Sequence, residues 1–261
     1  MAIALLCALG AIVGVLAGLL GIGGGAILVP ALIYLLPKLG VGSSVLTQMA
    51  VGTSLGSICI NSILSARAHH RRGGVLWRVV LSLAPGLVLG GLLGAWIAHF
   101  LSSLVLQRIV GVALLLIALR LITGGQPSGQ RELPGVPALA GVGTFIGGLS
   151  SLIGIGGGAV TVPFLNWCNV AMARAVGTSA ACGIAIAWSG VLGFALAGWG
   201  SAETGVASLG YISLPAVAAI TVCSLVTIQF GAALAYRLPA RALKRIFAVL
   251  LVAVGINMLV G

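Results

Sequence analysis

The sequence contains almost no acidic residues. Asp is absent, and Glu occurs only at Glu132 and Glu203, against 13 Lys and Arg residues. Charged residues make up 6% of the 261 residues, whereas a soluble domain carries about 25%. So few charges could not cover a surface exposed to water, and 60% of the residues are hydrophobic. The composition therefore excludes an ordinary soluble domain and predicts an all-α polytopic membrane protein.

Other absences exclude further classes of function. The five cysteines are dispersed, with no CxxC motif and no Cys/His spacing for a metal. The strings Gly21-x-Gly23-x-x-Ala26 and Gly154-x-Gly156-x-x-Ala159 have no acid near them, which a dinucleotide site needs. The apolar spans hold no nucleophile–base pair. We therefore expect no metal, no cofactor and no enzymatic activity.

The net charge of +11 does not indicate nucleic acid. The basic residues are scattered between apolar spans, with neither a basic face nor an aromatic platform for bases. Such residues are typical of the charges that set the orientation of a membrane protein. The predicted partners are therefore the lipid bilayer and a small substrate, with no nucleic acid.

Apolar segments recur along the chain and are separated by polar residues or by Pro and Gly. One clearly hydrophilic linker, at 124–134, divides the chain into two predicted transmembrane repeats, 1–123 and 135–261. The expected spans are 2–20, 26–37, 44–66, 75–100, 105–123, 136–153, 159–168, 174–198, 207–236 and 240–260.

The two halves repeat the same motifs in the same order. Gly21-Ile-Gly-Gly-Gly-Ala-Ile-Leu-Val-Pro30 matches Gly154-Ile-Gly-Gly-Gly-Ala-Val-Thr-Val-Pro163, and Val51-Gly-Thr-Ser54 matches Val176-Gly-Thr-Ser179. Leu106-Gln-Arg108 matches Leu243-Lys-Arg245. Three ordered matches predict an internal duplication. Paired interruptions of this kind in apolar segments are typical of the binding site of a secondary transporter.

The number of membrane crossings in each half depends on whether the chain turns back at the GIGGG motif. As one helix, residues 2–37 would be about 54 Å long, well beyond a hydrocarbon core of about 30 Å. That interpretation gives parallel four-plus-four repeats, with six Lys and Arg residues on one side and seven on the other. A hairpin broken at the glycines instead gives eleven inside and leaves only Lys38 and Arg108 outside. The positive-inside rule favours two inverted-topology repeats, each a broken Gly-rich hairpin plus three transmembrane helices, with a cytoplasmic linker; the parallel arrangement is the alternative.

The breaks are the predicted site of an anion. A helix that restarts after the glycines presents free N–H groups and the positive end of its dipole. The predicted spans hold no acid, which argues against a cation. Alternatively, the glycines serve helix packing, Ser and Thr bond their own helix, and Asn61 bridges two helices. The predicted midplane, substrate-binding residues are Gly23, Gly24, Gly25, Gly156, Gly157, Gly158, Thr53, Ser54, Thr178, Ser179, Gln48, Asn61 and Trp188.

Four stretches together resemble the TauE/SafE family, described as sulfite exporters. They are the paired GIGGGxxxVP motifs, VGTS in each half, RRGGVLWR at 71–78 and RLPARALKRIF at 237–247. The resemblance implies a multi-pass protein of the cytoplasmic (inner) membrane. It implies a secondary transporter that moves sulfite or an organosulfonate outward by alternating access. The alternatives are a passive anion channel and a transporter of another small oxyanion or carboxylate. The oligomeric state stays open, with a homodimer as one option.

The inverted arrangement makes a prediction about sidedness. Single cysteines placed beside Arg71 and beside Arg241, in a cysteine-free background, should both react with an impermeant maleimide only after the cells are permeabilised. Both positions then lie on the cytoplasmic side, as the charge count requires. Labelling of the two positions from opposite sides would instead establish the parallel arrangement.

Overall fold

The computed structural model describes residues 2–20, 24–123, 133–201, 207–234 and 240–260. These ranges are helical, with no strand beyond an isolated bridge between Ser208 and Ser213. The helices are α1 (Ala2–Leu20), α2 (Gly25–Leu35), α3 (Leu46–His70), α4 (Trp77–Phe100), α5 (Ser103–Thr123), α6 (Val136–Ile153), α7 (Gly158–Trp167), α8 (Met172–Ala197), α9 (Leu214–Leu234) and α10 (Ala240–Val260), with short 3-10 turns at Leu36–Leu39 and Ser43–Val45.

The helices follow the apolar spans that the sequence predicts. Some ends differ by a few residues, and two of these differences have local reasons. The span expected at 26–37 stops being α-helical at Leu35, because Pro37 cannot continue the hydrogen-bond ladder and a 3-10 turn takes over. The span expected to begin at 207 begins at Leu214, because Ala207 and Gly210 have positive φ values of 58° and 55°. Neither conformation is compatible with a helix.

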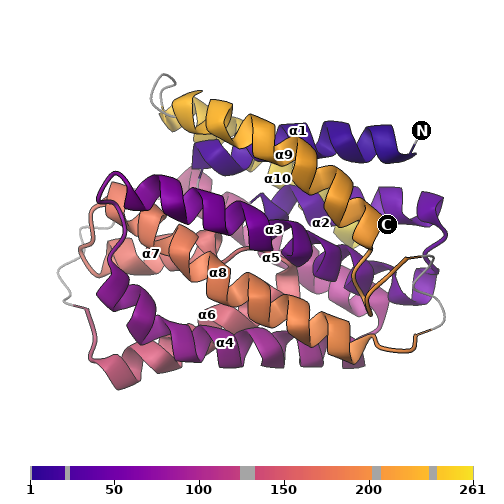
Figure 1. Cartoon of the computed structure of the whole chain (residues 1–261), viewed down its shortest axis with the longest axis horizontal. Helices are drawn as coiled ribbons and strands as arrows, with labels where there is room; N and C mark the ends of the chain where they lie inside the picture. The colour runs from indigo at the N-terminus through magenta and orange to yellow at the C-terminus, as the bar shows by residue number, and fades with distance from the viewer. Residues whose placement is uncertain (1, 21–23, 124–132, 202–206, 235–239, 261) are drawn as a thin grey trace.

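Five stretches are long and apolar enough to cross a membrane by length and composition. They are Ser43–His70, Trp77–Phe100, Ser103–Arg120, Val136–Ile153 and Ala173–Ala197, and shorter apolar helical stretches occur in α1, α2, α9 and α10. The prediction of a multi-pass, all-α membrane protein is therefore confirmed. Figure 1 shows the helices side by side, with the start of α1 and the end of α10 at the same end of the molecule.

Glycines allow helices from different halves to pack closely. In α4, Gly86, Gly90 and Gly94 lie directly against the backbone of α6, so that no Cβ would fit at any of the three. In α1, Gly10 and Gly14 meet the backbone of α9 in the same way. Because α1 and α6 occupy equivalent places in the two halves, as do α4 and α9, the duplicated elements form duplicated interfaces. Close backbone approach is the main source of packing energy between helices in lipid.

The equivalent helices α3 and α8 lie against each other and run in opposite directions. Gly52, near the start of α3, lies 3.2 Å from Phe194 near the end of α8, measured from a Cβ built on the glycine. At the other end, Gly177 of α8 packs on the backbone of Gly74, just after α3. The long helices α3 and α8, which carry the two VGTS motifs, are thus antiparallel.

The threonines of the two VGTS motifs tie the halves together. The Thr53 hydroxyl accepts a hydrogen bond from the N–H of Ser213, at 3.0 Å, just before α9. The Thr178 hydroxyl accepts one from the N–H of Leu76, also at 3.0 Å, just before α4. Each hydroxyl therefore satisfies a backbone donor at the entrance to a helix of the other half. An unpaired buried donor of this kind would be costly.

Removing either hydroxyl should destabilise the protein. Thr53→Val and Thr178→Val keep the side-chain shape but leave a backbone N–H unpaired, which should cost about 1–3 kcal/mol each. The loss should appear as a lower unfolding temperature of the protein in detergent. Thr53→Ser and Thr178→Ser retain the hydroxyl and serve as controls. Unchanged unfolding of both Val variants would show that these hydrogen bonds do not hold the halves together.

Candidate functional site

Two left-handed glycines mark the breaks before α2 and α7. Gly24 precedes α2 with φ 72°, and Gly157 precedes α7 with φ 79°. Any larger residue is strained in this region of φ. A side chain on Gly24 would also collide with Val13, and one on Gly157 with Ile186. These two glycines are therefore required by the backbone itself.

The two breaks lie against each other. Gly25, the first residue of α2, packs on the carbonyl oxygen of Gly154 and lies 3.0 Å from the Ile155 Cα, measured from a Cβ built on the glycine. Ser54 of α3 donates a hydrogen bond from its hydroxyl to the same Gly154 carbonyl, at 2.9 Å. Segments 130 residues apart in the chain thus meet beside Ile58, the middle residue of α3.

At both helix starts, backbone N–H groups lack a backbone acceptor among the described residues. They belong to Gly25 and Ala26 in α2 and to Gly158 and Ala159 in α7. Unpaired N–H groups and the positive end of the helix dipole favour an anion.

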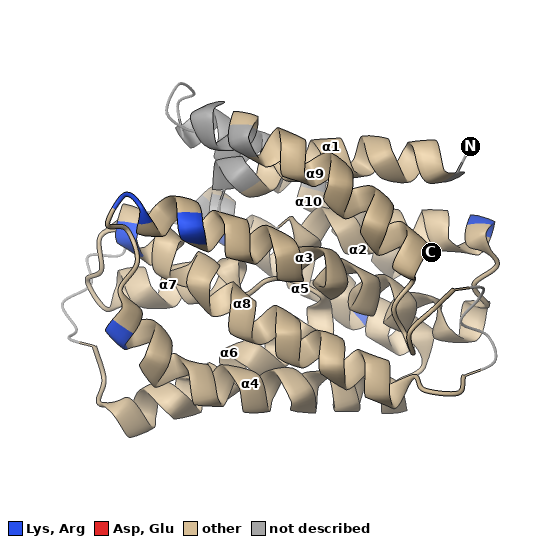
Figure 2. Ribbon diagram, in the orientation of Figure 1, with Lys and Arg blue, Asp and Glu red and all other residues tan. Residues whose placement is uncertain are grey.

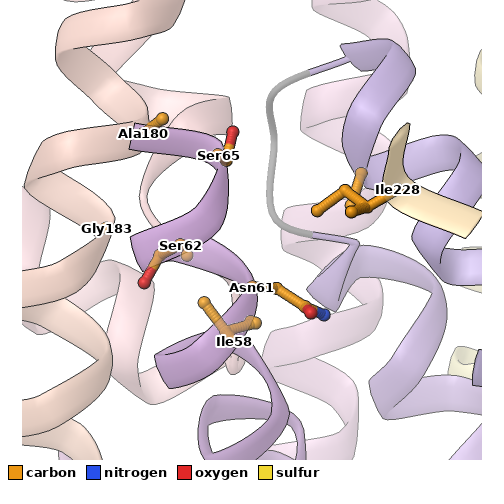
Figure 3. Close-up of a pocket in the computed structure, with 9 residues that line it drawn as sticks. Ile58, Asn61, Ser62, Ser65, Ala180, Gly183 and Ile228 are labelled. Atoms are coloured by element: carbon orange, nitrogen blue, oxygen red, sulfur yellow. The ribbon is translucent and has the colours of Figure 1, made fainter. Parts of the chain in front are cut away.

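A pocket lies beside the second break, between α3 and α8 (Figure 3). It has about 280 Å³ of empty space, which includes the part open at its mouth. Its lining comes from α1, α3, α8, α9 and the break before α7, and consists of Ala17, Ile58, Asn61, Ser62, Ser65, Gly156, Ala180, Gly183 and Ile228. The interior is narrow, with room for about one water molecule. An oxyanion would therefore need the lining helices to move apart slightly.

Asn61 supplies the pocket with a buried, unpaired donor. The residue is 1% exposed, and its Nδ2 has no hydrogen-bond partner among the described residues. Its Oδ1 accepts a hydrogen bond at 2.9 Å from the hydroxyl of Ser224 in α9. Figure 3 shows the Asn61 side chain extending from α3 away from Gly183 of α8, on the side of the pocket where Ile228 lies. The same Ser224 hydroxyl also lies 2.9 Å from the Thr221 carbonyl oxygen. The Asn61 NH₂ group has no partner among the described residues and is available to a ligand.

Two serines that the sequence analysis did not select complete the polar lining. Ser62 donates its hydroxyl to the Cys59 carbonyl at 3.1 Å, and Ser65 lies one turn after Asn61 on the same helix face. The signal that could have identified them is the run Asn61-Ser-x-x-Ser65 within an otherwise apolar stretch.

The polar lining is specific to one half. In the register of the VGTS repeat, Asn61, Ser62 and Ser65 correspond to Ile186, Ala187 and Gly190. Ile186 and Ala187 are completely buried. The duplicated backbone therefore carries a polar pocket on α3 and an apolar equivalent on α8.

The predicted site residues lie in different parts of the structure. Gly24, Gly25, Gly156, Gly157, Gly158, Ser54 and Asn61 gather around the two breaks and the pocket. Ser179 is buried in α8 with no hydrogen-bond partner among the described residues, and Thr53 and Thr178 hold the backbone contacts described above. Gly23 lies outside the described residues.

Gln48 and Trp188 lie away from the pocket. Gln48, in the first turn of α3, donates from Nε2 to the Leu101 carbonyl at 2.7 Å. This hydrogen bond joins the start of α3 to the turn between α4 and α5. Trp188 is 56% exposed on the outer surface of α8. Its position is typical of a side chain that faces lipid.

Most of the Lys and Arg residues in the described part of the chain gather at one end of the helices. Figure 2 shows this end, where α3 ends and α4 begins. His69 and His70 belong to it, and His70 Nδ1 accepts a hydrogen bond at 3.0 Å from Trp77 Nε1. Lys38 lies after α2 and Arg108 within the first turns of α5, apart from this cluster.

The described residues hold no group of three His, Cys, Asp or Glu side chains that could bind a metal. What the geometry offers is a set of neutral donors at the middle of a helical bundle.

Known proteins resemble this chain along almost its whole length. A family model described as "Sulfite exporter TauE/SafE" matches residues 6–258. A "Probable membrane transporter protein" of Haemophilus influenzae is 40% identical over 257 residues, which cover 97% of each chain. A protein with a similar description from Methanocaldococcus jannaschii is 28% identical over 258 residues, 98% of this chain and 94% of the relative. No solved structure matches.

Proposed function

Because this chain belongs to the TauE/SafE family of sulfite exporters, we propose that it is a secondary transporter of a small sulfur-containing anion, sulfite or an organosulfonate, and moves it outward across the cytoplasmic membrane. Its relatives in Haemophilus influenzae and Methanocaldococcus jannaschii are described as probable membrane transporters. The function of a membrane transporter follows from the family, and the substrate, direction and mechanism are our proposal.

The observation that carries the proposal is the unpaired Asn61 Nδ2 beside the second break. A buried amide donor without a partner is costly, and a ligand that accepts its hydrogen bond removes that cost. Gly156, from the break itself, lines the same pocket. An anion bound there would have its lost hydration replaced by fixed dipoles, which an ion in a membrane requires.

Inverted halves would let this site face either side of the membrane in turn. The antiparallel packing of α3 on α8 and the exchanged threonine hydrogen bonds support inverted-topology repeats. The gathering of Lys and Arg at one end supports that end as the cytoplasmic one. Rocking of one half against the other would then expose the pocket alternately. The narrow pocket described above corresponds to a closed state in this cycle, which favours a transporter over an open channel.

Binding of sulfite should depend on Asn61 and on the width of the pocket. In Asn61→Leu, one hydrogen bond to a charged ligand is lost, which should weaken binding about ten- to hundredfold. In Gly183→Ala, the added Cβ would lie 2.9 Å from the Gly156 carbonyl oxygen and narrow the pocket. Sulfite should therefore raise the unfolding temperature of the wild-type protein in detergent much more than that of either variant.

Gly141→Ala is the matched control, since a Cβ at Gly141 meets no atom within 4 Å. It should keep the full response to sulfite. The same proteins in proteoliposomes should show saturable sulfite flux only where binding survives. Undiminished flux through Asn61→Leu would exclude this pocket as the site. A large conductance uncoupled from any second gradient would identify a channel instead.

A further inference from the structure

The pocket at Asn61 is polar but carries no charge. All nine residues that line it are uncharged. The nearest basic residue along α3 is Arg67, which is exposed at the end of the helix. Among the described residues, an anion in this pocket would therefore be held by neutral dipoles, with no cation in the lining to balance its charge.

Neutral dipoles discriminate between anions by their charge. The cost of removing an ion from water grows with the square of its charge, so that a doubly charged ion costs about four times as much as a singly charged one of equal size. The attraction to a fixed set of dipoles grows only in proportion to the charge. A site without a cation therefore favours singly charged anions.

We infer that this pocket binds the singly charged form of a small oxyanion and rejects the doubly charged form. For sulfite, the bound species is hydrogen sulfite. Organosulfonates carry a single charge and should bind at every pH. Sulfate carries two charges and should not bind. The inference rests on the proposed function, because it concerns the same pocket and specifies the charge of the substrate that binds there.

The test is binding of sulfite, methanesulfonate and sulfate to the purified full-length protein, measured from pH values below the second ionisation of sulfite to values above it. Above that ionisation, the affinity for total sulfite should fall about tenfold for each pH unit, as its singly charged form disappears. The affinity for methanesulfonate should stay constant, which controls for titration of the protein. Sulfate should not compete with either ligand.

A charge added to the pocket should remove the selectivity. Ser65→Lys places a cation in the lining, and sulfate should then compete with methanesulfonate. Ala68→Lys adds the same charge at an exposed position of α3 and should leave sulfate excluded. If both variants admit sulfate equally, the selectivity does not arise in the pocket and the inference is wrong.

Two wild-type outcomes separate this inference from the proposed function. Sulfite affinity that is constant across its second ionisation, or competition by sulfate, overturns the charge selectivity and leaves sulfite transport standing. Absence of binding by both sulfite and methanesulfonate at every pH overturns the proposed function, and the inference with it.

Discussion

Polar backbone groups cannot be left unpaired in a membrane, and this constraint explains most of the structure. Each half interrupts a helix deep in the bundle, where lipid offers no hydrogen bonds. The chain tolerates these interruptions because the two breaks pack on each other, with Gly25 against Gly154, and because Ser54 satisfies the Gly154 carbonyl. The pocket at Asn61 lies beside the second of these breaks, with Gly156 in its lining. The same constraint thus builds the scaffold and leaves a place for the ligand.

The internal duplication explains the symmetry of the fold. Differences between the two halves explain why the pocket is polar on α3 and apolar at the equivalent positions of α8. Equivalent helices form equivalent interfaces, and the two VGTS threonines cap helices of opposite halves. At the centre, however, Asn61 faces the pocket from α3 while its counterpart Ile186 is a buried apolar residue of α8. Asn61, Ser62 and Ser65 make the α3 side of the pocket polar.

The sequence was informative about whatever has a local cause. Apolar spans, glycine breaks and the repeat are visible in it because helix length, left-handed φ and duplicated motifs are properties of short segments. Asn61 stood out because an amide is rare in an apolar helix. The roles of Thr53 and Gln48 could not be predicted, because their partners, Ser213 and Leu101, lie in segments that only the three-dimensional packing brings near. A hydroxyl in a motif looks the same whether it binds a ligand or a backbone N–H.

The central claim is that the anion binds in the pocket at Asn61, beside the second glycine break, and is held there without a cation in the lining. The most direct measurement is a map of the protein bound to sulfite, at a pH where hydrogen sulfite is abundant. We expect density for the anion within hydrogen-bond distance of Asn61 Nδ2 and next to Gly156, with the lining helices slightly separated. Density at the basic loop around Arg71 instead, with the pocket closed and empty, would contradict this account.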